Sequence, residues 1–265
     1  MKSTNKSAIT LISKGIALIL LSVTNAFQVQ AEDKTIIVLD PGHSGKDVKS
    51  VDAKTGLNDH DYPNHPEMEE TFRVAKKVGE QLEKSGYSVL CTKKDVNDTV
   101  SLRERATIAQ RAHAALGVSI HNDHGQSYKD FAQVYEQKVG QWRGGSTEKP
   151  LASFTNKEIA KISDSYAKIF ARERSRAEQH IVTVTPISFD NRPGIEPGNI
   201  PQVMLFAGTE PDAVPWVYNE VGGKNFGPKQ EALYATGIAN AIKKCVKNSH
   251  NNRKIETTSN HKTVQ

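Results

Sequence analysis

Two short apolar runs, each followed by a histidine, constrain most strongly what this chain can fold into. Residues 35–40 (TIIVLD) are β-forming and end at a Pro-Gly turn signal, directly before His43. Residues 116–120 (LGVSI) form a second run, which His121 closes. In an open α/β sheet, ligands and reacting groups gather at the carboxyl ends of parallel strands. If these two strands are neighbours, both imidazoles point into one crevice.

The elements between and around these runs predict an α/β fold. A helix is expected from Pro66, which suits a first helical turn, to the residue before Gly86. A strand over 87–92 and a second helix over 101–114 follow. This β-α-β-α-β order favours a single domain in which helices flank a mostly parallel twisted sheet, with the reactive residues at the carboxyl ends of its strands.

The second half of the chain has weaker signals. An alternating run over 133–140 suggests an exposed strand, and a charged helix is expected over 158–179. Two apolar runs, 202–207 and 214–218, are interpreted as strands. A last helix is expected over 228–246, before a polar, basic segment (248–265) whose composition predicts disorder.

The first residues have the composition of a targeting segment. Lysines precede an apolar stretch at 15–23, and Val29-Gln30-Ala31 offers small residues at the usual cleavage spacing. We therefore expect residues 1–31 to be a signal peptide that is cleaved after Ala31. The mature protein would then be periplasmic or secreted, with no membrane attachment.

The basic charge of the chain does not indicate nucleic-acid binding. The formal net charge is +5, but the expected signal peptide contributes three lysines and no acid, and the segment after Cys245 contributes a net +3. The folded part is therefore close to neutral, and no nucleic acid is expected among its partners. The two cysteines, Cys91 and Cys245, could pair in an oxidising compartment or remain as buried thiols.

His43 and His121 supply two of the three protein ligands that a hydrolytic zinc site needs, with water in the fourth position. The third ligand is expected at the start of the helix after the first strand, because that end faces the same crevice. Glu67, Glu69 and Glu70 all compete for this role. Each is also an ordinary acid of a first helical turn.

Four motifs in sequence order resemble the zinc-dependent N-acetylmuramoyl-L-alanine amidases of the amidase-3 type. These are LDPGH at His43, a glutamate that opens the next helix, S-L-R-x-R-A from Ser101, and S-I-H-N-D at His121. The resemblance is specific over residues 35–123 and loose beyond. One departure is Lys93, which replaces the arginine of the family's T-R-x-x-D, so a bidentate contact made by that arginine would be lost.

The resemblance implies a ligand set. In this family the zinc ligands are the histidine of D-P-G-H, the helix glutamate and the histidine of S-I-H. The family's spacing between that glutamate and the glycine that ends the helix selects Glu67, with Glu70 as the fallback. By resemblance, therefore, His43, Glu67 and His121 would bind Zn²⁺.

The family also uses a glutamate near its carboxyl end, in a P-x-V-L-V-E-x-G strand end, as the proton shuttle. Residues 214–222 (VPWVYNEVG) fit this motif and place Glu220 at the acid's position. A competing register over 200–208 (IPQVMLFAG) places Phe206 there, which would make the protein an inactive relative. The first register keeps the chemistry and is the prediction.

The resemblance implies an exported zinc amidase that cleaves the amide between N-acetylmuramic acid and L-alanine in peptidoglycan. Peptidoglycan or a muropeptide would be the substrate, and an activator protein is a further candidate partner. Two alternatives stay open: an inactive wall-binding relative, and another zinc hydrolase such as a peptidase or a deacetylase. The catalytic domain is expected over 32–247, with an insertion at 124–199. As a hypothesis, this insertion includes a substrate-selecting wall or an inhibitory helix over the cleft.

Overall fold

The computed structural model describes residues 34–50, 52–53, 59–122, 132–136, 140–143, 150–186, 199–208, 211–222 and 227–260. The expected signal peptide, residues 1–31, lies outside these ranges. Among the helices of the described part, none is long and apolar enough to span a bilayer.

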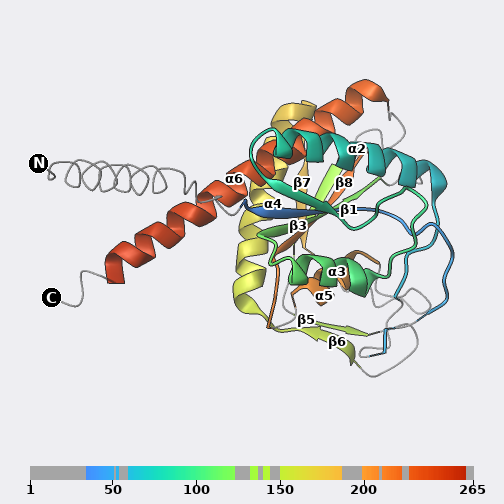
Figure 1. The fold of residues 1–265 in the computed structure, drawn as a ribbon, viewed down its shortest axis with the longest axis horizontal. Helices are drawn as coiled ribbons and strands as arrows, with labels where there is room; N and C mark the ends of the chain where they lie inside the picture. Colours follow the sequence, from blue (N-terminus) through green and yellow to red (C-terminus); the bar gives the residue numbers. More distant parts are fainter. Residues whose placement is uncertain are drawn as a thin grey trace, which may run out of the picture. The chain divides into compact units, whose positions relative to one another are not determined.

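A six-stranded sheet forms the centre of the fold, with the strand order β2-β1-β3-β8-β4-β7 (Figure 1). The strands are β1 (Ile36–Pro41), β2 (Ser88–Cys91), β3 (Leu116–His121), β4 (Ala132–Glu136), β7 (Thr183–Pro186) and β8 (Trp216–Val221). Neighbours among β2, β1, β3 and β8 pair in parallel, and β4 pairs antiparallel with β8 and parallel with β7. The predicted α/β fold with a mostly parallel sheet is thus confirmed.

Helices cover both faces of the sheet. On one face lie α2 (His65–Glu83), α4 (Lys157–Glu178) and α6 (Pro228–Asn260), and on the other lie α3 (Leu102–Arg111) and α5 (Asn199–Ala207), as Figure 1 shows. Alternate residues of β1 serve the two faces: Ile37 and Leu39 belong to the first core, and Val38 to the second. This alternation follows from the two-residue period of a strand.

A separate antiparallel pair, β5 (Gly140–Arg143) and β6 (Pro150–Phe154), lies beside the second face, near α5. Phe154 is buried in the core of α3 and α5. The hairpin is therefore tied to the domain at its carboxyl end.

The apolar run 202–207 belongs to helix α5, so its prediction as a strand was wrong. Val203, Met204, Leu205, Phe206 and Ala207 are all buried. A short run that is buried on every side has no periodicity that separates a strand from a helix. Packing against α3 decides the outcome here.

Much of the expected insertion at 124–199 is built into the fold. The predicted strand over 133–140 corresponds in part to β4, which lies inside the sheet between β8 and β7 rather than at an edge. The predicted helix over 158–179 is confirmed as α4, but Ala167 and Phe170 pack it into the first core. A helix that is buried in this way is a layer of the domain, which contradicts its interpretation as an inhibitory helix over the cleft.

Helix α6 is longer than the sequence predicts, and the two cysteines are not paired. Helix α6 continues to Asn260, through most of the segment 248–265 that was expected to be disordered. Extending an existing helix needs no new nucleation, so a polar sequence can continue one that packing has already formed. Cys91 and Cys245 are both free thiols.

Candidate metal centre

Parallel pairing brings the two histidine-bearing strand ends together. β1 and β3 are neighbours, with Pro41 opposite Ile120, and the backbone N–H of Gly42 donates to the carbonyl of Ile120 at 3.0 Å. The rings of His43 and His121 follow directly, with centroids 4.7 Å apart. The two histidines that the sequence places at strand ends are therefore adjacent in the fold.

Glu67 joins the two imidazoles from the first turn of α2. Pro66 stands in this turn, as expected, and the Asn64 amide before it donates to Glu67 Oε2 at 2.7 Å. Ligand atoms of His43, Glu67 and His121 all lie within 4.8 Å of one another. The three residues come from β1, α2 and β3, so only the folded chain assembles them.

One oxygen of Glu67 is the centre of this cluster. Oε1 lies 3.1 Å from Nε2 of His43 and 3.1 Å from Nδ1 of His121, and it accepts the backbone N–H of Asn122 at 2.9 Å. Burial alone would raise the pKa of this carboxyl, but the hydrogen bonds with both rings outweigh it and hold the pKa well below its usual range. Glu67 is therefore a carboxylate at neutral pH.

The donor set suits a zinc ion. Two imidazoles and one carboxylate are a typical catalytic zinc set. Nε2 of His43 and Nδ1 of His121 converge on the same oxygen of Glu67, each at 3.1 Å, so one donor atom of each residue faces a common point. The residues present therefore fit the metal that the resemblance implies.

Glu70, the fallback ligand, has a different position. Its Oε2 accepts a hydrogen bond from the Asn122 side-chain amide at 2.8 Å, and it does not belong to the group of three. Asn122 thus links the two glutamates: its backbone contacts Glu67 and its side chain contacts Glu70. This places Glu70 one layer behind the candidate metal centre.

Glu220 lies beside the cluster on the next strand. In the parallel pairing of β3 with β8, Glu220 is opposite His121. Tyr218, two residues earlier on the same side of β8, stacks on the His121 ring with centroids 4.5 Å apart. Glu220 is 7 % exposed, so its carboxyl is largely removed from water at this end of the sheet.

Phe206 does not occupy an equivalent position. It lies in α5 rather than at a strand end, it is buried, and the Arg103 guanidinium lies 4.1 Å from the centre of its ring. The competing register requires Phe206 to stand at a strand end, where the family has its catalytic glutamate, and Phe206 does not stand at one.

Glycines allow close packing on both sides of the site. A Cβ at Gly42 would lie 2.1 Å from Cε1 of His121, so no side chain fits there. Gly222, two residues after Glu220, has a φ of +138°, and a Cβ there would lie 2.4 Å from the Tyr234 hydroxyl. The close contacts at Gly42 and Gly222 thus explain why a glycine stands at each of these motif positions.

Sequence reasoning missed several groups that support the site. Asp40 is buried and accepts hydrogen bonds from Thr92 and Ser119, each at 2.7 Å. Arg105, the second arginine of the S-L-R-x-R-A motif, is fully buried and lies 3.2 Å from Asp61 and 3.5 Å from Asp40. The aspartate of LDPGH was a usable signal, whereas Asp61 lies in a loop without periodicity.

Tyr62 was also missed. It is 55 % exposed, and its ring centroid lies 4.7 Å from that of His43. An exposed aromatic ring therefore borders the candidate metal centre. It comes from the same loop before α2 as Asp61, where no pattern in the sequence singles it out.

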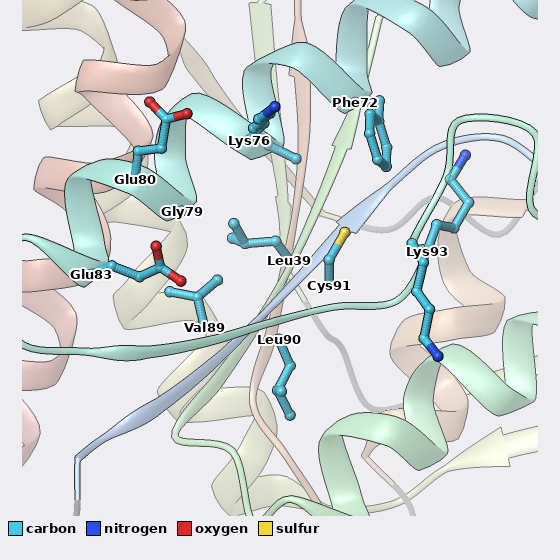
Figure 2. A pocket seen from close by; sticks show the side chains of 12 residues that line it. Leu39, Phe72, Lys76, Gly79, Glu80, Glu83, Val89, Leu90, Cys91 and Lys93 are labelled. Atoms are coloured by element: carbon cyan, nitrogen blue, oxygen red, sulfur yellow. The ribbon is translucent and has the colours of Figure 1, made fainter.

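A groove of about 570 Å³ lies between α2 and the edge strand β2, and Figure 2 shows its lining. Its floor is largely apolar, with Leu39, Phe72 and Val89, and Lys93 lies at the end opposite Glu80 and Glu83. None of His43, Glu67, His121 and Glu220 lines it. The candidate site is therefore identified by the metal-ligating groups of His43, Glu67 and His121 and not by this groove.

Comparisons with known proteins identify the fold and the family of this chain. A search of curated protein sequences found no match. Solved structures with a similar fold include the N-acetylmuramyl-L-alanine amidase Ami1 from Mycobacterium smegmatis, at 20 % identity and a TM-score of 0.53, over 81 % of this chain and 97 % of that one. Ami1 from Mycobacterium abscessus is 18 % identical with a TM-score of 0.56, over 80 % and 98 % of the two chains.

The catalytic domain of CwlV, an amidase from Bacillus (Paenibacillus) polymyxa, is also 18 % identical, with a TM-score of 0.51 over 80 % of this chain and 98 % of that one. At these identities the structures show a shared fold. A sequence model of the N-acetylmuramoyl-L-alanine amidase family Amidase_3 matches residues 37–259, which is most of the chain. The chain therefore belongs to the N-acetylmuramoyl-L-alanine amidase family Amidase_3.

Proposed function

We propose that this protein is an exported, zinc-dependent N-acetylmuramoyl-L-alanine amidase that hydrolyses peptidoglycan. The observation that carries the proposal is the buried group of His43, Glu67 and His121, with Glu220 opposite His121 on the neighbouring strand. Family membership supports the substrate class. Export is supported by the composition of residues 1–31.

In this proposal His43, Glu67 and His121 hold the zinc ion. When bound, zinc supplies Lewis-acid chemistry: it polarises the scissile carbonyl and lowers the pKa of a coordinated water. The low pKa of Glu67 keeps its carboxylate ionised, so it is available as a ligand without first losing a proton. The hydrogen bond from Asn64 holds the carboxylate from its other oxygen.

Glu220 acts as general base and then as general acid. Its carboxylate takes a proton from the attacking water while the water oxygen bonds to the lactyl carbonyl carbon of N-acetylmuramic acid. Glu220 then gives that proton to the nitrogen of L-alanine as the carbon–nitrogen bond breaks. The products are a free lactyl carboxylate and a stem peptide with an amino terminus. Burial of Glu220 excludes bulk water that would compete for the proton.

Mass spectrometry of the products tests this function. The mature protein is incubated with purified peptidoglycan, with and without a chelator. We expect free stem peptides that begin with L-alanine, lost on chelation and restored by Zn²⁺. Acetate release would indicate a deacetylase instead, and an unchanged wall with folded, zinc-loaded protein would contradict the proposal.

A further inference from the structure

Lys93 has an unusual environment for a lysine. It lies directly after β2 and is 1 % exposed, although lysines are rarely buried without an acidic partner. Among the described residues no carboxylate lies within ion-pair distance of its ammonium. Nζ instead contacts three backbone carbonyl oxygens: that of His43 at 2.8 Å, that of Val96 at 3.3 Å and that of Gly42 at 3.4 Å.

Two of these carbonyls flank a candidate metal ligand. The Gly42 carbonyl belongs to the peptide group before His43, and the His43 carbonyl belongs to the peptide group after it. An ammonium has three N–H donors, so a single Lys93 can fix both peptide groups. Thr71, one helical turn after Glu67, also donates to the Gly42 carbonyl, at 2.8 Å. The main chain on both sides of His43 is therefore fastened by buried side chains.

This fastening matters because, in the part of the chain that the structure describes, only one nitrogen of the imidazole has a polar partner: Nε2 lies 3.1 Å from Oε1 of Glu67, which is itself a candidate ligand. A metal-binding histidine usually donates its second ring nitrogen to a carboxylate or carbonyl, which fixes the ring. Nδ1 of His43 has no such partner within the described ranges. The direction of its ring therefore depends on the main chain that carries it, together with the Nε2 contact to Glu67 and the ring contacts to Tyr62 and His121.

We propose that Lys93 is a positioning residue of the metal centre. Through the carbonyls of Gly42 and His43, its ammonium holds the His43 imidazole in the orientation that binds the ion. A compact charge with three freely directed donors suits convergent carbonyl oxygens, whereas the planar fork of an arginine suits carboxylates and phosphates. The proposal rests on the zinc site proposed above.

The test measures metal binding rather than turnover. Lys93→Met removes the three donors and keeps an unbranched side chain that tolerates burial. Lys94→Met is the matched control, since Lys94 is the next residue and is exposed. Zinc affinity is measured by competition with a chromophoric chelator, and the visible absorption spectrum of the Co²⁺-loaded protein reports the geometry of the ligands.

We expect Lys93→Met to bind zinc at least about tenfold more weakly than the wild type, as is typical when a partner that orients a ligand is lost. Its Co²⁺ spectrum should change, while Lys94→Met matches the wild type in both readouts. If Lys93→Met does not fold, Lys93→Gln replaces it; this variant keeps an amide donor and should show a smaller loss of affinity with the same spectral change.

Two outcomes would overturn the proposal in distinguishable ways. A folded Lys93 variant with wild-type zinc affinity and an unchanged Co²⁺ spectrum would show that Lys93 is only structural, and the zinc amidase proposal would stand. A wild-type protein that binds no zinc would contradict the proposed metal centre itself, and the role of Lys93 with it.

Discussion

Two buried clusters in this domain each contain a glutamate, and their partners differ in kind. At the carboxyl end of the sheet, Glu67 contacts two imidazoles, an amide and a backbone N–H. Behind the sheet, Glu178 of α4 makes hydrogen bonds of 2.6 and 3.2 Å with the fully buried Arg174. Arg174 also donates to the Asn219 side chain of β8 at 3.3 Å.

The difference separates a binding site from a structural link. A guanidinium keeps its charge at any pH that a folded protein meets, so Glu178 has a permanent partner. An imidazole can lose its proton and present a lone pair, so the partners of Glu67 can become metal ligands together with it. The first cluster can accept a cation, whereas the second joins α4 to the strand that carries Glu220.

The largest effect is expected from Glu67→Gln, which keeps the shape of the side chain and removes its charge. We expect zinc affinity to fall by more than about 100-fold, beyond the usual effect of losing an outer partner, and activity to be lost. Glu70→Gln is the matched control and should cost about tenfold or less. Metal content and chelator competition measure both, and a larger loss in Glu70→Gln would reverse the assignment.

Glu220→Gln should separate chemistry from metal binding. Loss of the proton shuttle should lower kcat by about 10²- to 10⁴-fold, while zinc affinity stays within about twofold of the wild type. Release of stem peptides measures the activity, and Glu158→Gln, an exposed change in the first turn of α4, serves as the control. An active Glu220→Gln enzyme would remove Glu220 from the mechanism.

Arg174→Met should show the opposite pattern. It leaves Glu178 buried without its guanidinium, which typically destabilises a protein by about 3–5 kcal/mol. We expect a lower free energy of unfolding in denaturant titrations, with unchanged zinc stoichiometry in the fraction that stays folded. If the variant is as stable as the wild type, the cluster behind the sheet is not the link that the contacts suggest.

The smallest effect concerns pH and His180, whose Nε2 lies 3.2 Å from Glu178. The hydrogen bond with Glu178 raises the pKa of His180 above its ordinary value of 6.5. A raised pKa contributes stability that is fully present below pH 6.5 and is lost as the pH rises through the folded-state value. The pKa of Glu178 is lowered: burial raises it, but Arg174 and His180 outweigh this, so Glu178 stays ionised throughout that window.

His180→Gln measures this contribution. The wild type should exceed the variant in stability by less than about 1 kcal/mol at acidic pH, and the difference should vanish as the pH rises. Denaturant unfolding from about pH 5.5 to about pH 8.5 follows the change. A difference that is constant across this range would show that the stabilisation does not depend on the charge of His180.

The sequence by itself determined the elements whose pattern is local. A β-forming run that ends in Pro-Gly before His43, and another that ends at His121, are readable because strand period and turn chemistry act over a few residues. The proline and acids that begin α2 have the same local character. From these, together with a family resemblance, the mostly parallel fold and the candidates His43, Glu67, His121 and Glu220 could be named.

Only the tertiary structure decided the form or role of the segments that are packed on several sides. The run 202–207 became a helix because α3 and the sheet bury it, and β4 entered the sheet interior through pairing with two distant strands. Glu67 and Glu70 are separated by one turn of the same helix, so their roles depend on which of them meets the imidazoles. The burial of Lys93 against the carbonyls around His43 likewise results from long-range packing, which no local pattern in the sequence encodes.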